Sequence, residues 1–230
     1  MEKTDSIFIN GHRHLRYNGQ SLTPGESIER SKSFYNHLNE RRSVRTFSTA
    51  PVPKEVIDNI IMAASTAPSG AHKQPWTFCA VSNAGLKTQI RIAAEKEEQE
   101  NYEGRMSERW RKDLEHLGTD EHKPFLEDAP WLIAVFKRAY EVEESGEKHN
   151  NYYVNESVGI ACGMLISAIH NAGLVTLTHT PSPMNFLTGL LDRPGNERAF
   201  LLLPVGYAAE PSYVPDIHRK TLEEIAAFYL

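Results

Sequence analysis

Residues 160–181 read IACGMLISAIHNAGLVTLTHTP and combine a helix, a helix stop and a strand in one run. The first part completes a predicted helix over 151–172, whose many small residues permit close approach of another backbone. Asn171-Ala172-Gly173 is a glycine C-cap signal that ends this helix. The segment 174–178 then predicts a strand, so both kinds of element belong to one domain.

Helices and short strands alternate on both sides of this run. Pro53 opens an amphipathic helix that carries Val56, Ile57, Ile60, Ile61 and Ala64 on one face. Further helices are expected over 31–40, from residue 83 to about 117, and from residue 221 with Leu222, Ile225 and Phe228 on one side. Further strands are expected over 76–81, 131–136 and 200–206. This alternation predicts an α/β or α+β layered domain.

The length of 230 residues suits one large domain, and no break in composition favours two. We expect an N-terminal arm over 1–25 and one domain over 26–230. The arm is polar and contains Pro24-Gly25, so we expect it to be ordered only where it packs on something.

Composition excludes several classes of protein. A net charge of -5 argues against a nucleic-acid-binding protein, which usually carries a basic excess. No apolar stretch reaches the roughly 18–20 residues that cross a bilayer, and the N-terminus does not read as a signal peptide. Cys79 and Cys162 lie far apart in apolar segments, which predicts buried thiols in a reducing compartment and no metal site. We therefore expect a soluble, cytoplasmic protein.

The sequence lacks the glycine-rich patterns that cradle nucleotides. Neither Gly-x-Gly-x-x-Gly nor the P-loop pattern occurs, which disfavours a classical nicotinamide-binding fold. Phosphate binding is instead suggested by Arg41-Arg42-Ser43-Val44-Arg45, because guanidinium groups and a hydroxyl can hold a phosphate monoester by bidentate hydrogen bonds. A solvated basic turn is the alternative interpretation of this motif.

Two loops have a composition suited to contact with a planar ligand. Residues 66–72 form a tight turn between a helix and a strand, and its backbone N–H groups could lie flat against a ring. Thr178-His179-Thr180 places hydroxyls at the end of a strand, where they could donate to a cofactor. Each motif could equally be only a turn or a loop.

Glu98, Tyr102 and Lys123 are candidate ligands for an amino acid. Glu98 and Tyr102 are four residues apart and share one face of the predicted polar helix, and Lys123 follows it. An anion, a phenol and a cation suit the ammonium and carboxylate groups of such a ligand. Ordinary solvated surface charges are the alternative interpretation.

Taken in order, these motifs resemble the nitroreductase superfamily and, within it, the iodotyrosine deiodinase family. The resemblance runs from about Leu38 to Ile225 and includes RRSVR, TAPSGAHKQPWTF and VPDIHRK. The set of Glu98, Tyr102 and Lys123 separates deiodinases from their relatives. The resemblance implies an α+β, nitroreductase-like, FMN-dependent fold with a central mixed sheet flanked by helices. It also implies a domain-swapped homodimer whose FMN sites are built from both chains.

The resemblance further implies which residues contact FMN. They are Arg41, Arg42, Ser43, Val44, Arg45, Ser69, Thr178, His179, Thr180 and Arg219. The guanidinium groups would serve the phosphate and the pyrimidine edge of the flavin. The Thr180 hydroxyl would donate to flavin N5, which favours transfer of electrons one at a time. Such transfer suits removal of iodide from an aromatic ring, because the ring is a poor hydride acceptor.

The implied reaction is reductive removal of halide from halogenated tyrosines, giving tyrosine and iodide from mono- and diiodotyrosine. The phenolate oxygen would lie near the Ala71 backbone N–H. A halogen lowers the phenol pKa, so phenolate capture selects halotyrosine over tyrosine. Glu98 would take the ammonium, Lys123 the carboxylate, and Tyr102 would hydrogen-bond in the same clamp. Residues 89–123 would then form a lid that excludes water.

The electrons are expected to come from NADPH or NADH, directly or through a separate flavin reductase. A generic NAD(P)H-dependent nitroreductase or quinone reductase is the first alternative, and it would not need the clamp. A flavin-fragmenting enzyme of the same superfamily is the second alternative. A non-catalytic module that binds flavin or an amino acid is the third.

Overall fold

The computed structural model describes residues 5–230, so residues 1–4 of the predicted arm lie outside the described residues. The chain divides into two compact units, with the boundary between Glu40 and Arg41. The smaller unit contains a hairpin of β1 (Ser6–Ile9) and β2 (His12–Leu15), followed by helix α1 (Pro24–Glu40). The expected boundary between residues 25 and 26 thus lies within α1.

Helix α1 begins at Pro24, so the helix start predicted at residue 31 was wrong. Thr23 and Glu26 form a capping box, in which Glu26 Oε2 accepts from the Thr23 N–H at 2.8 Å and Thr23 Oγ1 accepts from the Glu26 N–H at 3.3 Å. Pro24 occupies the first helical position, where an N–H group would lack an intrahelical partner anyway. Within the expected arm, Asn10 and Gly11 have positive φ angles of 50° and 80° and close the β1–β2 hairpin.

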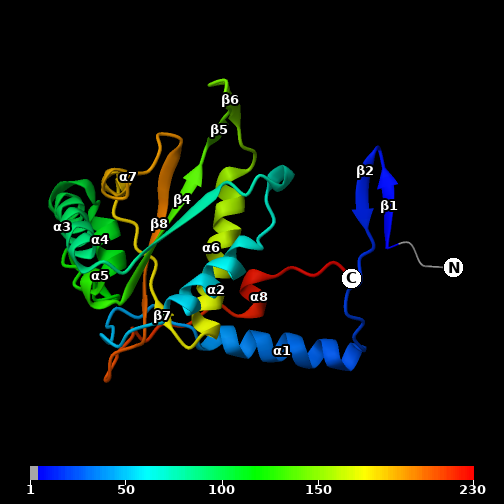
Figure 1. The fold of residues 1–230 in the computed structure, drawn as a ribbon. Helices are drawn as coiled ribbons and strands as arrows, with labels where there is room; N and C mark the ends of the chain where they lie inside the picture. Colours follow the sequence, from blue (N-terminus) through cyan, green and yellow to red (C-terminus); the bar gives the residue numbers. More distant parts are fainter. Residues whose placement is uncertain (1–4) are drawn as a thin grey trace. The chain divides into compact units, whose positions relative to one another are not determined.

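The larger unit is built on a sheet with the strand order β3-β4-β8-β7 (Figure 1). The strands are β3 (Trp76–Val81), β4 (Trp131–Arg138), β7 (Val175–Thr176) and β8 (Glu197–Gly206). Their ladders are antiparallel, and the bridge between Ser43 and Thr176 is parallel. The α+β fold is confirmed, but the ladders between the described strands of this sheet are antiparallel rather than mixed, and the parallel pairing is an isolated bridge outside them.

Alternate side chains of the central strand β4 pack into two different hydrophobic cores, one on each face of the sheet. Ile133 and Val135 belong to a core with helices α2 (Lys54–Ser65) and α6 (Val154–Asn171). On the other face, Leu132, Ala134 and Phe136 belong to a core with α3 (Ala84–Glu100), α5 (Phe125–Asp128) and α7 (Asn185–Leu190) (Figure 1). A strand that is buried on both faces is apolar throughout, which is why 131–136 could be predicted as a strand.

The polar helix predicted from residue 83 to about 117 is interrupted. Helix α3 ends at Glu100, a π-helical turn covers Asn101–Arg105, and α4 spans Glu108–Glu115. Between them Met106 is extended and buried. Ser107 caps α4 by accepting a hydrogen bond from the Trp110 N–H at 3.2 Å. The prediction of one continuous helix was wrong because Ser107 starts a new one.

The predicted end of α6 is confirmed, whereas the predicted extent of the last helix is wrong. Gly173 has a φ angle of 73° and donates its N–H to His170 O at 3.0 Å, which confirms the predicted C-cap of α6. Helix α8 covers only Leu222–Ile225. Ala226 returns to extended backbone, so the placement of Phe228 on this helix was wrong. The structure also contains the hairpin of β5 (Tyr140–Val142) and β6 (Lys148–Asn150), which was not predicted.

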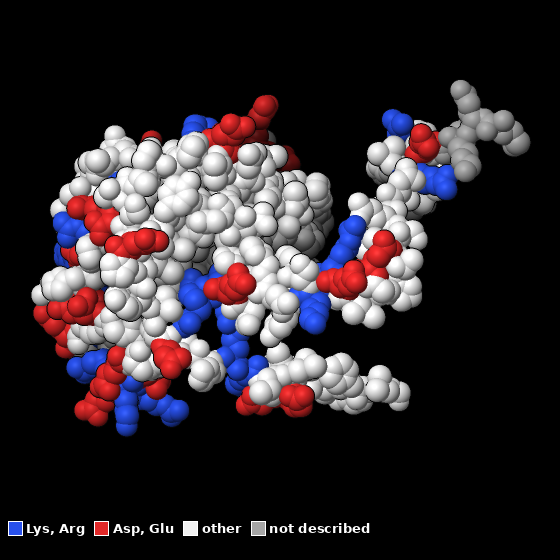
Figure 2. Space-filling view, turned by 90° about the horizontal axis from the view of Figure 1, so that it is seen from below, with Lys and Arg blue, Asp and Glu red and all other residues white. Residues whose placement is uncertain are grey.

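The surface carries both signs of charge. Figure 2 shows basic and acidic side chains interspersed on the face that it presents, in keeping with the mild net charge of -5. Among the described residues, no helix combines the length and the apolar character that a membrane span requires.

Candidate active site

The Arg41–Arg45 segment is fixed beside the edge strand β7. The Val44 N–H donates to Thr176 O at 3.2 Å, and Ser43 forms the parallel bridge with the same residue. Val44 is buried. Neighbouring side chains of an extended segment point to opposite sides, so burial of Val44 turns Ser43 and Arg45 outward. Pairing with Thr176 therefore brings Arg45 near Thr178.

Guanidinium groups converge on a cavity of about 460 Å³. Its polar lining comprises Arg41, Arg42, Ser43, Arg45, Thr178, His218 and Arg219. Arg219 Nη2 donates to Arg41 O at 2.7 Å, and the Arg42 guanidinium donates to the Pro215 carbonyl, so the C-terminal segment is docked here. No carboxylate is among the described residues that line this cavity. Burial, and then the charges of Arg219 and Arg42, lower the pKa of Arg41, which indicates a site built for an anion.

The larger cavity fits FMN in size and in chemistry. Its volume of about 460 Å³ lies within the roughly 300–1,000 Å³ of small-molecule sites. Guanidinium groups match a phosphate bidentately. The apolar lining residues Leu114, Leu117 and Ile217 provide a surface for a flat ring. These residues could therefore hold the phosphate and the ring system of the cofactor.

A smaller cavity of about 220 Å³ adjoins the larger one, since Arg45, Leu114 and Thr178 line both. Glu98, at the end of α3, lines it together with Tyr102 and Lys123. The structure therefore brings together Glu98, Tyr102 and Lys123, the residues predicted to bind an amino acid, directly beside the arginine-lined cavity.

The charged groups of the smaller cavity are close but not tightly paired. Glu98 Oε2 lies 3.6 Å from Lys123 Nζ, and the two side chains are 11% and 4% exposed. A charge-assisted hydrogen bond would be about 2.7–2.9 Å long, so Glu98 keeps capacity for a ligand. The Lys123 ammonium donates to the Asp120 carbonyl, and the Tyr102 hydroxyl donates to Thr119 O at 3.0 Å. Lys123 Nζ also donates to Thr119 Oγ1 at 3.3 Å, which leaves one of its three N–H groups for Glu98 or for a ligand. Burial raises the pKa of Glu98 and lowers that of Lys123, and each group counters part of the other's shift.

Thr178, His179 and Thr180 follow β7 and line the smaller cavity. The His179 N–H donates to Leu202 O at 2.9 Å, and the Leu202 N–H donates to His179 O at 3.0 Å, so the segment is held to the sheet. Burial, and then the charges of Lys123 and Arg45, lower the pKa of His179 to about 3. The imidazole is thus neutral at physiological pH. Its buried Nε2 has no hydrogen-bond partner among the described residues, and the ring packs edge-on against Phe125 with centroids 5.6 Å apart.

Ser69 and Ala71 line neither cavity. They belong to the turn between α2 and β3, where a 3-10 turn, η1, covers Gly70–His72. Ala71, His72 and Gln74 have positive φ angles of 49°, 55° and 47°. Side chains rarely tolerate this backbone conformation, and such residues cluster at ligand sites.

Apolar side chains from the segment between Met106 and Leu117 also line the cavities and were not predicted. Met106, Trp110 and Leu114 line the smaller cavity, and Leu114 and Leu117 line the larger one. Their spacing of four, four and three residues is the helical apolar period, so the signal was present in the sequence.

Comparisons with known proteins agree with this geometry. The model of the nitroreductase family matches residues 38–207. The chain is 59% identical to the iodotyrosine deiodinase of Haliscomenobacter hydrossis, over 94% of this chain and 97% of that protein. It is 46% identical to iodotyrosine deiodinase 1 of Homo sapiens, over 92% of this chain and 74% of that protein. A crystal structure of oxidized iodotyrosine deiodinase bound to FMN and 3-iodo-L-tyrosine matches with a TM-score of 0.74 at 30% identity, covering 85% of this chain and 100% of that one.

Proposed function

This chain belongs to the nitroreductase family and, within it, to the iodotyrosine deiodinases, and from this premise we propose that it removes halide from halotyrosines with bound FMN. The carbon–halogen bond is replaced by a carbon–hydrogen bond, which consumes two electrons and one proton for each halide released. One observation carries the proposal: an arginine-lined cavity adjoins a cavity that contains the buried, charged Glu98 and Lys123.

FMN would occupy the larger cavity and supply the electrons when bound. The guanidinium groups of Arg41, Arg42, Arg45 and Arg219 would hold its phosphate and the pyrimidine edge of its flavin. Ser43 and Thr178 line the same cavity. The remaining proposed contacts are Val44 and Ser69, which line neither cavity, and His179 and Thr180, which line the smaller one. The flavin would therefore reach the boundary between the two cavities, where Thr178 lines both.

The halotyrosine zwitterion would enter between Glu98 and Lys123. Glu98 would accept hydrogen bonds from the ammonium group and Lys123 would donate to the carboxylate. The present gap of 3.6 Å leaves both groups available. Tyr102 would hydrogen-bond in the same clamp. Trp110 and Leu114 would cover the bound ring and exclude water, which strengthens the charge interactions beneath them.

A homodimer would complete the site. The family resemblance assigns Ser69 to FMN and the Ala71 N–H to the phenolate oxygen, yet these residues line neither cavity of one chain. A second copy could bring its own turn to the open side of each cavity. Sedimentation of the FMN-loaded protein should then give the mass of two chains.

The electron donor is proposed to be NADPH or NADH, acting directly or through a separate flavin reductase. We place the reaction in the cytoplasm, where reducing conditions keep thiols free. Cys79 and Cys162 are free thiols in the structure.

The proposed function is tested by one turnover without oxygen. The FMN-loaded protein is reduced with dithionite, mixed with one equivalent of 3-iodotyrosine, and followed by flavin absorbance and iodide release. We expect one iodide for each flavin oxidised. If the flavin stays reduced with iodotyrosine but is oxidised by a nitroarene, the generic nitroreductase is the better assignment. A flavin that breaks down under oxygen would indicate the flavin-fragmenting alternative, and iodotyrosine bound without turnover would indicate the non-catalytic module.

Arg41→Ala is expected to weaken FMN binding by about 10- to 100-fold, the value of one charge-assisted contact to phosphate. The measurement is a fluorescence titration of the apoprotein with FMN. Arg198→Ala is the matched control, because Arg198 donates to Gly195 O and lines neither cavity. Equal FMN affinity for Arg41→Ala and Arg198→Ala would remove Arg41 from the phosphate site.

A further inference from the structure

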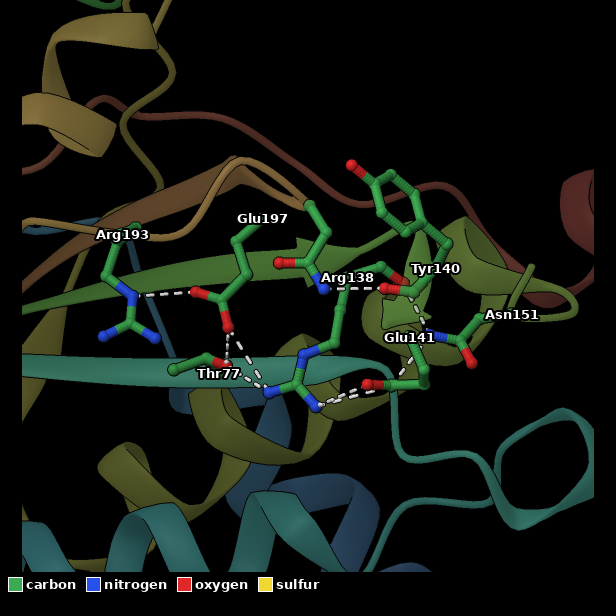
Figure 3. Close-up of polar contacts among 8 residues, drawn as sticks. Thr77, Arg138, Tyr140, Glu141, Asn151, Arg193 and Glu197 are labelled. Carbon is green, nitrogen blue, oxygen red and sulfur yellow. Dashed lines mark hydrogen bonds and ion pairs between the residues drawn. The ribbon is translucent and has the colours of Figure 1, made fainter. Parts of the chain in front are cut away.

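A partly buried charged network joins β8 to β3, β4 and the β5–β6 hairpin, and none of its members lines either cavity (Figure 3). At its centre is Glu197, whose side chain is 1% exposed. Its Oε2 accepts a hydrogen bond from Arg193 Nε at 2.7 Å. Its Oε1 accepts from Thr77 Oγ1 at 2.6 Å and from Arg138 Nη2 at 3.3 Å. Burial raises the pKa of Glu197, but the bonds from Arg193 and Thr77 lower it overall, so the carboxylate stays charged at neutral pH.

Arg138 extends this network to the segments that flank the 69–74 turn. Its Nη1 lies 3.4 Å from Glu141 Oε1 on the hairpin. The buried Asn151 donates from Nδ2 to Arg138 O at 3.0 Å and to Glu141 Oε1 at 3.1 Å. The Arg138 N–H donates to Pro75 O at 2.9 Å, immediately after the turn. The Arg138 backbone is therefore bonded both to the exit of the turn and to Asn151, the residue that precedes Tyr152, whereas the Arg138 side chain is linked to Asn151 only through Glu141.

Tyr152 and Tyr153 form the wall on which the turn rests. A Cβ atom placed on Gly70 would lie 2.9 Å from Tyr152 O and 3.0 Å from Tyr153 Cδ2, so only glycine fits there without a shift. The Gly70 N–H also donates to Ser157 Oγ of α6 at 3.3 Å. The position of Asn151 therefore determines where this wall, and the turn in contact with it, can lie.

The turn depends on such support because its backbone is strained. Ala71, His72 and Gln74 have positive φ angles of 49°, 55° and 47°, a conformation that persists only where the surroundings hold it. Inside the turn, the Gln74 N–H donates to Ser69 Oγ at 2.9 Å. Further restraint comes from the wall, from the Gly70 bond to Ser157 and from the backbone bond at Pro75. The Arg138 side chain supports the wall through Glu141 and Asn151.

We propose that Arg138 is a positioning residue for the 69–74 turn: through Glu141 and Asn151 its side chain fixes the wall on which the turn rests, so that the Ala71 N–H keeps the orientation that binds a phenolate oxygen. The inference rests on the proposed function for what the turn binds, and on geometry alone for what holds it. Glu197 and Glu141 lie on either side of the guanidinium and fix its direction. Arg138 would thus act on the substrate only through the turn.

The test uses the FMN-loaded protein and the variant Arg138→Gln. Hydrogen exchange is measured at the amides of His72, Lys73 and Gln74, which are hydrogen-bonded within the turn. KM and kcat are measured with 3-iodotyrosine. We expect exchange to be about 10-fold faster and KM about 10-fold higher, while kcat changes by less than about 2-fold.

Arg193→Gln is the matched control. It removes the other guanidinium from Glu197, on the side away from Glu141 and Asn151 (Figure 3). It should lower the melting temperature as Arg138→Gln does, with exchange in the turn and KM unchanged. Gly70→Ala pushes the turn off its wall without touching the network, and should reproduce the faster exchange and higher KM. If Arg138→Gln does not fold, Glu141→Gln tests the same link at its more exposed end, where the side chain is 37% exposed.

Each outcome is decisive. A lowered melting temperature of Arg138→Gln with wild-type exchange in the turn would overturn the proposal and leave the network a purely structural one. Faster exchange in both Arg138→Gln and Arg193→Gln would also overturn it, because the effect would then be general loosening. Failure of the wild-type protein to release iodide would reject the proposed function instead, and the exchange rates would still decide the positioning role.

Discussion

Replacement of Glu98 by glutamine is expected to weaken binding of 3-iodotyrosine by about 100-fold, ~2.7 kcal/mol, in the oxidised FMN-loaded protein. The carboxylate is 11% exposed, so water screens its attraction for the substrate ammonium only weakly. The amide has the same shape but carries no charge. Binding is measured by the quenching of flavin fluorescence on titration with the substrate.

The reference ligand for this variant is 2-iodophenol, which has the same halogenated phenol but no zwitterion. Its affinity should change by less than about 2-fold, since it makes no contact with Glu98. Glu97→Gln is the matched control on the same helix, because Glu97 pairs with Arg105 at 2.9 Å and does not line the cavity. If Glu98→Gln binds iodotyrosine as tightly as Glu97→Gln does, Glu98 does not bind the substrate ammonium group.

The clamp also predicts a pH dependence. Burial raises the pKa of Glu98, and Lys123 reverses only part of the shift. The ammonium group needs the charged carboxylate, so affinity for iodotyrosine should fall as the pH drops through this raised pKa. Glu98→Gln has no carboxyl group to protonate, so its affinity for iodotyrosine should not show this fall at low pH. If the affinity of the variant falls over the same pH range, the fall is caused by protonation of another group.

Local patterns in the sequence were sufficient to predict much of the fold. The continuous apolar run over 131–136 and the Gly173 stop signal each depend on a few neighbouring residues, and both agree with the structure. The errors were also local: Thr23 and Glu26 cap α1, and Ser107 restarts a helix. Asn10-Gly11 closes a hairpin, a turn signal that was present but not used.

Long-range pairing limits what can be predicted of the site. Arg45 reaches the neighbourhood of Thr178 because Val44 bonds to Thr176, and no pattern within either motif specifies that bond. Their association was inferred from the family resemblance alone. The position of Ser69 and Ala71 relative to FMN is a harder case, since in the proposed homodimer it would depend on a second chain. The network of Arg138 was not foreseen, because its members come from segments more than a hundred residues apart, such as Thr77 and Glu197.

Replacement of Thr180 by alanine is expected to slow dehalogenation of 3-iodotyrosine by about 10-fold or more while reduction of a nitroarene changes by less than about 2-fold. Thr180 lines the smaller cavity directly after His179, which is held to β8 by the paired bonds with Leu202 at 2.9 and 3.0 Å. The hydroxyl therefore stands on a rigid base and can hold a hydrogen bond to flavin N5. Such a bond would favour delivery of electrons one at a time, which removal of iodide from the ring would need and hydride transfer to a nitroarene would not.

The ratio of the two rates separates this role from general damage to the site. A loss of FMN or a distorted cavity slows both reactions, whereas loss of the N5 contact slows only dehalogenation. Thr180→Ser keeps the hydroxyl and removes a methyl group, so it should stay within about 3-fold of the wild-type protein in both assays. If Thr180→Ala lowers both activities equally, the hydroxyl does not select the reaction. The same conclusion follows if Thr180→Ser is as slow in dehalogenation as Thr180→Ala. The choice between dehalogenation and nitroreduction would then have to come from the clamp at Glu98 and Lys123.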